Sequence, residues 1–225
     1  MKGAIFDLDG TVVDNMPLHV EAFTIFAGRH GLPPLTLADR RRLDGKRNRD
    51  IFPDLFGRPL PEEELRAYAD EKEALYRALS GGRLTTVPGF DRLLDLLEER
   101  AVPVAIATSA PPENVEHTLR ELGLTGRLRV VARSDEVARG KPWPDVFLAA
   151  AARIDLPPAS CMAFEDAPAG VASAAAAGMP TVALTTSFEA ADFRSQSIQP
   201  DYIVHDFDEF LDGAGRWLLP SETAG

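Results

Sequence analysis

The sequence is short of three features that would define its class at once. It has one cysteine, Cys161, so an internal disulfide is excluded and we expect a reducing, cytoplasmic environment. No apolar run approaches the ~20 residues that cross a bilayer, and residues 1–7 show no signal-peptide pattern, so we expect no membrane association. Basic residues are outnumbered, 24 Lys+Arg against 35 Asp+Glu, so we expect no nucleic-acid surface.

Short apolar runs with strand character are present, and they alternate with helical patterns. The expected strands span residues 3–6, 103–108, 128–131, 161–164, 181–184 and 202–204. The helical patterns that alternate with them span residues 90–100, 112–123, 144–154 and 167–178. Nearly continuous apolar strands indicate a parallel sheet covered on both faces. The sequence therefore predicts an α/β fold with a doubly wound, Rossmann-like parallel sheet.

One stretch after the first strand breaks this alternation. From residue 17 to residue 82 the sequence shows no convincing strand. It shows helical patterns instead, separated by proline and glycine, at residues 18–30, 37–43, 49–56 and 62–79. We therefore expect residues 1–16 and 83–225 to form the α/β core and residues 17–82 to form an inserted α-helical cap subdomain.

Chemically reactive side chains stand where the expected strands end. In an open α/β sheet, ligands bind beyond the carboxyl ends of the strands. The side chains at these ends are Asp7, Asp9, Thr108, Glu165 and Asp166, with Lys141 in a loop before a helix. Four converging carboxylates would repel one another, and a hard divalent cation with oxygen ligands neutralises them most simply. We therefore expect Mg²⁺ at this site, beside a substrate phosphate.

These groups suit phosphoryl transfer. The carboxylate of Asp7 can attack phosphorus and form an aspartyl-phosphate, provided that charge repulsion is shielded. Asp9 lies close enough to protonate the leaving oxygen and later to deprotonate water, while Lys141 offsets charge on the transferred group. Taken alone, Asp7-Leu8-Asp9 is an ordinary turn and Glu165-Asp166 an ordinary helix cap. Their occurrence together, in order at successive strand ends, favours a catalytic role.

The motifs resemble those of the haloacid dehalogenase-like hydrolase superfamily, within its β-phosphoglucomutase-like phosphatase subfamily. The likeness covers essentially the whole chain. It rests on Asp7-Leu8-Asp9-Gly10-Thr11, on Thr108, on Lys141 in Gly-Lys-Pro-x-Pro-Asp, and on Glu165-Asp166. The resemblance implies that Asp7, the backbone carbonyl of Asp9, and Asp166 hold Mg²⁺, with Glu165 further from the ion. It also implies that the helical insertion is a mobile cap that contacts the substrate.

Candidate substrate contacts follow from the same resemblance. They are His19, Gly45, Lys46, Arg47, Asn48, Arg49 and Lys72 in the insertion, and Ser109 and Ala110 after the second strand. His19 matches a family histidine near the second aspartate, and Lys72 matches a cap lysine. Each also has a simpler interpretation: His19 as a surface residue of a helix, and Lys72 as an i,i+4 partner of carboxylates on its own helix. The sequence leaves both interpretations open.

Two departures from the mutase pattern bear on the reaction. Asn48 stands where the mutase has an arginine, and Ala110-Pro111-Pro112 replaces a polar stretch. The leading hypothesis is therefore a phosphatase for a small phosphorylated metabolite of the sugar-phosphate class, as a monomer or small homo-oligomer. Alternatives are a β-phosphoglucomutase-like mutase and a receiver-type or non-catalytic phosphate-binding module. A haloacid dehalogenase is disfavoured, because it needs neither a second aspartate nor Mg²⁺.

Overall fold

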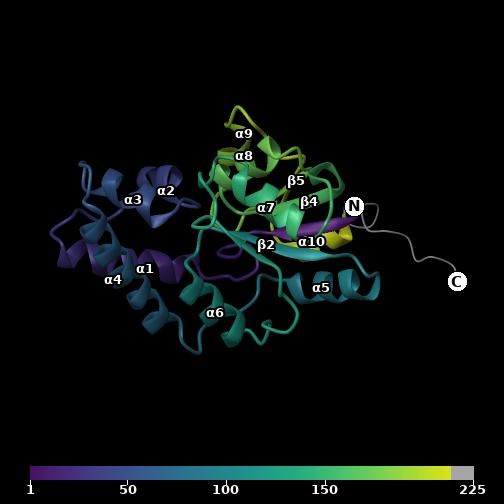
Figure 1. Cartoon of the computed structure of the whole chain (residues 1–225), viewed down its shortest axis with the longest axis horizontal. Coiled ribbons are helices and arrows are strands. Elements are labelled where there is room, and N and C mark those ends of the chain that lie inside the picture. The colour runs from purple at the N-terminus through teal and green to yellow at the C-terminus, as the bar shows by residue number, and fades with distance from the viewer. Residues whose placement is uncertain (214–225) are drawn as a thin grey trace, which may run out of the picture.

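A six-stranded parallel sheet organises the protein (Figure 1). The structure is a computed structural model, which describes residues 1–213. The strands lie in the order β3-β2-β1-β4-β5-β6. Their bounds are β1 Gly3–Phe6, β2 Val104–Thr108, β3 Val131–Arg133, β4 Cys161–Glu165, β5 Thr181–Leu184 and β6 Tyr202–Val204. Because β1 pairs with β2 on one side and with β4 on the other, the strand order reverses at β1, and ligands bind beside such reversals.

Helices cover both faces of the sheet, as its apolar strands predicted. Figure 1 shows α7 (Asp145–Arg153) and α8 (Pro168–Ala176) above the sheet, and α5 (Phe90–Glu99) and α6 (Pro112–Glu121) below it. Successive side chains along a strand point to opposite faces of the sheet. Ile5 therefore packs in the hydrophobic cluster between the sheet and helices α7 and α8, and Phe6 packs in the larger cluster between the sheet and α5. Cys161 is buried in β4, which agrees with the strand predicted at residues 161–164.

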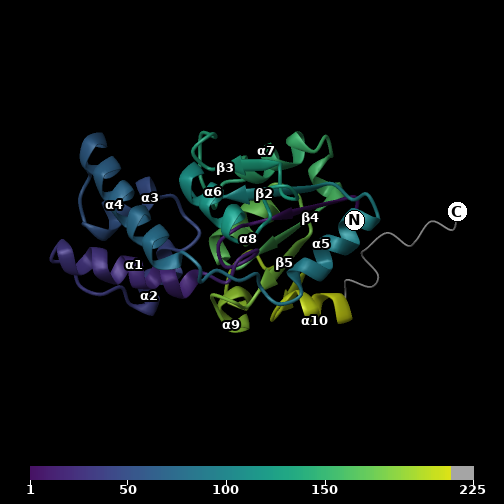
Figure 2. The ribbon, with the colours of Figure 1, turned by 90° about the horizontal axis from the view of Figure 1, so that it is seen from below.

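Four helices between β1 and β2 lie beside the sheet in both ribbon views (Figures 1 and 2). They are α1 Met16–Arg29, α2 Leu37–Leu43, α3 Asn48–Leu55 and α4 Glu62–Ser80. Phe26, Phe52 and Leu65 form a core of their own there, which is separate from the clusters of the sheet. The chain enters and leaves this region side by side, since Val13 bridges Thr86. This arrangement is compatible with the expected cap, whose boundaries stay a prediction.

The remaining elements are short, and one prediction about them is wrong. The third strand was expected at residues 128–131, but β3 begins only at Val131, opposite Ile106. Leu128 is still part of the turn after α6, because its N–H donates to the carbonyl of Leu124. The sequence also gave no sign of the 3₁₀ turn Pro158–Ser160, α9 (Ala190–Arg194) or α10 (Phe207–Asp212), which are too short to show helical periodicity.

Two further expectations concern the whole chain. Within residues 1–213, none of the helices combines the length and the apolar character that a membrane span requires. Residues 214–225, which the sequence assigned to the core, lie outside the described part of the chain.

Candidate active site

Asp7, Lys141 and Glu165 form a buried charged cluster at the carboxyl end of the sheet. Asp7 follows β1 directly, and its N–H donates to Phe164 of β4. The ammonium of Lys141 lies 2.5 Å from a carboxylate oxygen of Asp7, and it also donates to Glu165. The side chain of Lys141 is 1% exposed and that of Asp7 is 9% exposed. Three segments far apart in the sequence are thereby tied together by one cation.

Glu165 is held in place by backbone as well as by Lys141. One of its carboxylate oxygens accepts the N–H groups of Asp166 and Ala167, at 3.0 and 3.1 Å. Its other oxygen accepts from Lys141. The side chain lies against α8 at Gly170, where a Cβ would come within 2 Å of the carboxylate. Glycine is therefore required at position 170 for Glu165 to adopt this position.

The cluster has a donor set that could hold a divalent cation. Asp7, Glu165 and Asp166 each offer a carboxylate oxygen, and these oxygens lie within 4.8 Å of one another. Burial, together with Glu165 and Asp9 and against the effect of Lys141, raises the pKa of Asp7 to about 8. Burial, Glu165 and Asp7 likewise raise the pKa of Asp166 well above its usual range. The carboxylates thus exceed the charge that Lys141 can offset, so the residues present fit a divalent cation with oxygen ligands.

Asp9 faces away from this cluster, toward α1. The amide of Asn15 donates to its carboxylate at 2.6 Å, and His19 Nε2 lies 3.6 Å from the same oxygen. Burial opposes the charged form, but His19 and Asn15 outweigh it and hold the pKa of Asp9 below its usual range. Gly10 adopts φ +79°, which allows the turn between the two aspartates. A Cβ at this position would also overlap Asp166. Asp7 and Asp9 therefore lie in opposite electrostatic settings only two residues apart.

His19 belongs to a buried network. Its ring stacks on Tyr76 of α4, with centroids 3.9 Å apart, and the ammonium of Lys72 lies 2.9 Å from its Nδ1. His19 is 8% exposed and Lys72 is 3% exposed. His19 is therefore not a surface residue of its helix, and Lys72 pairs with the adjacent Glu73 rather than with a carboxylate one turn away.

The loop after β2 makes hydrogen bonds of its own beside the site. The N–H of Ala110 donates to Thr108 Oγ1 at 3.0 Å, so this amide is already engaged and does not point toward an anion. The Ser109 hydroxyl donates to the carbonyl of Gly45 at 2.8 Å, which joins the sheet to the loop before α3. Sequence reasoning placed these residues near the site but did not anticipate these bonds.

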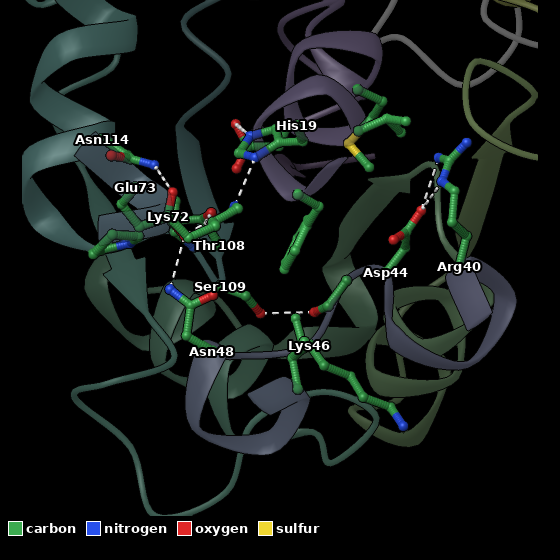
Figure 3. Close-up of a pocket in the computed structure, with 18 of the residues that line it drawn as sticks. His19, Arg40, Asp44, Lys46, Asn48, Lys72, Glu73, Thr108, Ser109 and Asn114 are labelled. Atoms are coloured by element: carbon green, nitrogen blue, oxygen red, sulfur yellow. Dashed lines mark hydrogen bonds and ion pairs between the residues drawn. The ribbon is translucent and has the colours of Figure 1, made fainter. Parts of the chain in front are cut away.

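A pocket brings most of the predicted side chains together (Figure 3). Those that line it are Asp7, Asp9, His19, Gly45, Lys46, Asn48, Lys72, Thr108, Ser109, Ala110 and Asp166. Lys141 and Glu165 are not in the lining and are buried against Asp7. Arg49 is not brought to the pocket, because its guanidinium pairs with Glu62 at 3.2 Å on the exposed side of the helices.

Several residues that sequence reasoning missed also shape the site. The amide of Asn15 donates to Asp9 and also to the hydroxyl of Tyr76, at 2.6 Å. Asn15 stands at the N-cap position of α1, but its side chain makes no capping bond. The Ser187 hydroxyl donates to Asp166. On the opposite wall, Glu73 accepts from Asn48 at 2.8 Å and from Asn114 at 2.6 Å. No motif marks these residues, because their partners come from distant segments.

Known proteins share this sequence pattern and fold. Residues 1–178 match the family described as haloacid dehalogenase-like hydrolase. The chain is 33% identical over 200 residues to validoxylamine A 7'-phosphate phosphatase of Streptomyces hygroscopicus subsp. limoneus, covering 84% of this chain and 88% of that protein. It is 33% identical over 189 residues to hexitol phosphatase A of Escherichia coli, covering 81% and 82%. The chain therefore belongs to the haloacid dehalogenase-like hydrolases.

The fold likeness extends to a mutase. The crystal structure of β-phosphoglucomutase from Clostridium difficile superposes with a TM-score of 0.83 and covers 97% of each chain, at 22% identity. At that identity the likeness shows the fold alone. The resemblance seen in the motifs is thus confirmed at the level of superfamily and fold, and the named sequence relatives are phosphoric monoester hydrolases.

Proposed function

We propose that the protein is a Mg²⁺-dependent phosphatase that acts on a small phosphorylated metabolite of the sugar-phosphate class through an aspartyl-phosphate. The observation that supports this most strongly is the separation of two aspartates. Asp7 lies in the buried cluster with Lys141, while Asp9 faces the pocket beside His19. A nucleophile and an acid/base group with separate environments are what two-step phosphoryl transfer requires. The relatives named as phosphatases of phosphorylated sugar-like compounds support the same reading.

In this proposal Asp7 attacks phosphorus, and the bond from phosphorus to the leaving oxygen breaks. Lys141 orients the Asp7 carboxylate and offsets charge on the transferred group. Mg²⁺, held by Asp7, Asp166 and the backbone carbonyl of Asp9 with Glu165 in support, would shield the approaching anions from each other. Water then attacks the aspartyl-phosphate, which releases inorganic phosphate and restores Asp7.

Asp9 moves the protons. In the free protein its carboxylate is charged, because His19 and Asn15 keep its pKa low, and this form can accept a proton from water. A dianionic phosphoryl group in the pocket favours the protonated form, which can donate to the leaving oxygen. The substrate itself therefore favours the protonated Asp9 that acts as the acid, and loss of that proton to the leaving group leaves the charged Asp9 that acts as the base.

The insertion, residues 17–82, would serve as the cap. Residues of the insertion and of the core line the same pocket, and several bonds join the two parts, among them Ser109 to Gly45 and the guanidinium of Arg47 to the carbonyl of Ser134 at 3.3 Å. Substrate entry would require these bonds to break. Their re-formation would close the pocket and exclude water during phosphoryl transfer.

The direct test is phosphate release from a panel of sugar monophosphates, nucleotides and pyrophosphate, with Mg²⁺ and with EDTA. We expect hydrolysis of sugar monophosphates that depends on Mg²⁺. Absence of phosphate release from every compound in the presence of Mg²⁺ would contradict the proposal and would favour a non-catalytic phosphate-binding module.

A β-phosphoglucomutase-like mutase is the second candidate, and the likeness of fold favours it. Against it, Asn48 in the cap loop is bonded to the carboxylate of Glu73 and presents no positive charge. Incubation with β-glucose 1-phosphate separates the two. Formation of glucose 6-phosphate without phosphate release would establish the mutase, whereas release of inorganic phosphate supports the phosphatase.

A further inference from the structure

Residues of the insertion form the pocket wall that faces the sheet, and its charged side chains are Arg40, Asp44, Lys46, Lys72 and Glu73. Most of these charges are paired with one another. Apart from Asp7, Asp9 and Asp166, the ionised side chains of the lining are Asp44 and Glu73 against Arg40, Lys46 and Lys72. Two of these three cations have a carboxylate partner in the lining itself. A second phosphate bound at this wall would therefore meet carboxylates as well as cations.

Glu73 is the centre of the first pair. It is 6% exposed and accepts from Lys72 at 3.0 Å, besides its bonds from Asn48 and Asn114 (Figure 3). Although burial opposes the charge, Lys72, His19 and Asn48 keep the pKa of Glu73 below its usual range. The charge of Lys72 is thus neutralised within the wall by a carboxylate that three donors hold in place.

Arg40 and Asp44 form the second pair. Two nitrogens of the Arg40 guanidinium donate to one oxygen of Asp44, at 3.0 and 2.8 Å. Lys46 has no carboxylate within ion-pair distance in residues 1–213, but its ammonium points away from Glu73 and Asn48 in Figure 3. The wall near Glu73 therefore offers carboxylate and amide oxygens, which accept hydrogen bonds from hydroxyl groups, and no free cation for a phosphate.

We propose that Glu73, with Asn48 and Asn114, is a specificity determinant that selects substrates with a single phosphate and a neutral, hydroxyl-bearing remainder, and rejects bisphosphates. This inference rests on the proposed phosphatase function and refines it. A second phosphate would place up to two negative charges beside Glu73, and like charges brought together in an enclosed site repel each other. The selectivity is a difference between the affinities for the two substrates. Sugar hydroxyls would instead donate to the free lone pairs of the Glu73 and Asn48 oxygens.

The test compares glucose 6-phosphate with glucose 1,6-bisphosphate, which differ only in the second phosphate. For the wild-type protein we expect kcat/KM to be at least about tenfold higher for the monophosphate. Glu73→Gln removes the carboxylate charge and frees the charge of Lys72, so this preference should shrink by about tenfold. Glu63→Gln, at an exposed position of the same helix, is the matched control and should keep the wild-type ratio.

The ratio separates selection from a merely structural role, since a disturbed pocket would lower both kcat/KM values together. Asp44→Asn provides a second variant, because it frees Arg40 in the same way and should also favour the bisphosphate. Equal use of both compounds by the wild type, or unchanged ratios in both variants, would overturn the inference while leaving the phosphatase proposal intact. If neither compound nor any other phosphomonoester is hydrolysed, the proposed function itself fails.

Discussion

The sheet end and the wall opposite it are both rich in buried charge, but their charges add up differently. At the sheet end, Asp7, Glu165 and Asp166 share the single ammonium of Lys141. On the wall, Lys72 and Glu73 form a one-to-one pair, and the amides of two asparagines complete it. The first region therefore needs a further cation, whereas Lys72 and Glu73 in the second already neutralise each other.

Under the proposed function, the two regions would contact different parts of a substrate. An excess of buried carboxylates is relieved by a divalent ion, which in turn attracts a phosphate. A balanced wall of carboxylate and amide oxygens is suited to hydroxyl groups. Changes at the sheet end are expected to affect the reaction itself, and changes at the wall are expected to affect the choice of substrate.

The largest effect is expected from Asp7→Asn. An amide cannot attack phosphorus, so turnover should fall by at least about 10⁴. Phosphate release measures the loss, and circular dichroism should show an unchanged fold. Appreciable activity in this variant would mean that another group is the nucleophile.

Asp9→Asn should slow turnover by about 10²–10⁴, the usual contribution of a positioned acid/base group. Asn15 and His19 can still contact the amide, so the pocket should keep its shape. The loss should be smaller for a substrate with a good leaving group, such as p-nitrophenyl phosphate, because less protonation is needed. An equal loss for all leaving groups would remove Asp9 from the acid role.

Lys141→Met tests the excess charge directly. Without its ammonium, three buried carboxylates are left together, and breaking a buried ion pair costs about 3–5 kcal/mol. We expect a fall in Tm in EDTA, partly reversed by Mg²⁺, while Lys2→Met at an exposed position should leave Tm unchanged. A variant as stable as the wild type in EDTA would show that Lys141 does not offset the cluster.

The pH dependence of the metal-free protein follows from the raised pKa of Asp7. Folded protein keeps this proton up to about pH 8, whereas an unfolded aspartate loses it near pH 4. Stability contributed by the group is therefore lost as pH rises between these values. Compared with Asp7→Asn, wild-type protein in EDTA should show a falling Tm from pH 5 to 8, and its Mg²⁺ affinity should rise by up to about tenfold per pH unit. A Tm difference that stays constant would contradict the assignment.

The smallest effect is expected at Arg49, whose partner Glu62 is exposed and outside the pocket. Arg49→Ala should change kcat/KM by less than about twofold, because exposed ion pairs contribute little. A large effect at Arg49 would show that residues 17–82 rearrange more than this structure displays.

Lys72→Ala, in contrast, removes the partner of Glu73 and His19 and should reorder the preferred substrates.

Much of the sheet could be predicted from the sequence, because a parallel strand covered on both faces must be apolar along its length. All six strands were found, although the third was placed three residues early, where the chain still turns back on Leu124. The eight longer helices were predicted to within two residues at each end. The very short helices were not, since five or six residues do not establish a helical period.

The sequence by itself determined the sheet-end cluster. Asp7 and Glu165-Asp166 adjoin apolar strands, and parallel topology brings the ends of neighbouring strands to one edge. Only the tertiary structure decided the wall. In the sequence Glu73 is one of many helix carboxylates, and its role depends on Asn48 and Asn114, which approach it only when α3, α4 and α6 pack together. Side chains joined by helix packing leave no local pattern, because their spacing along the chain is set by the loops between the helices.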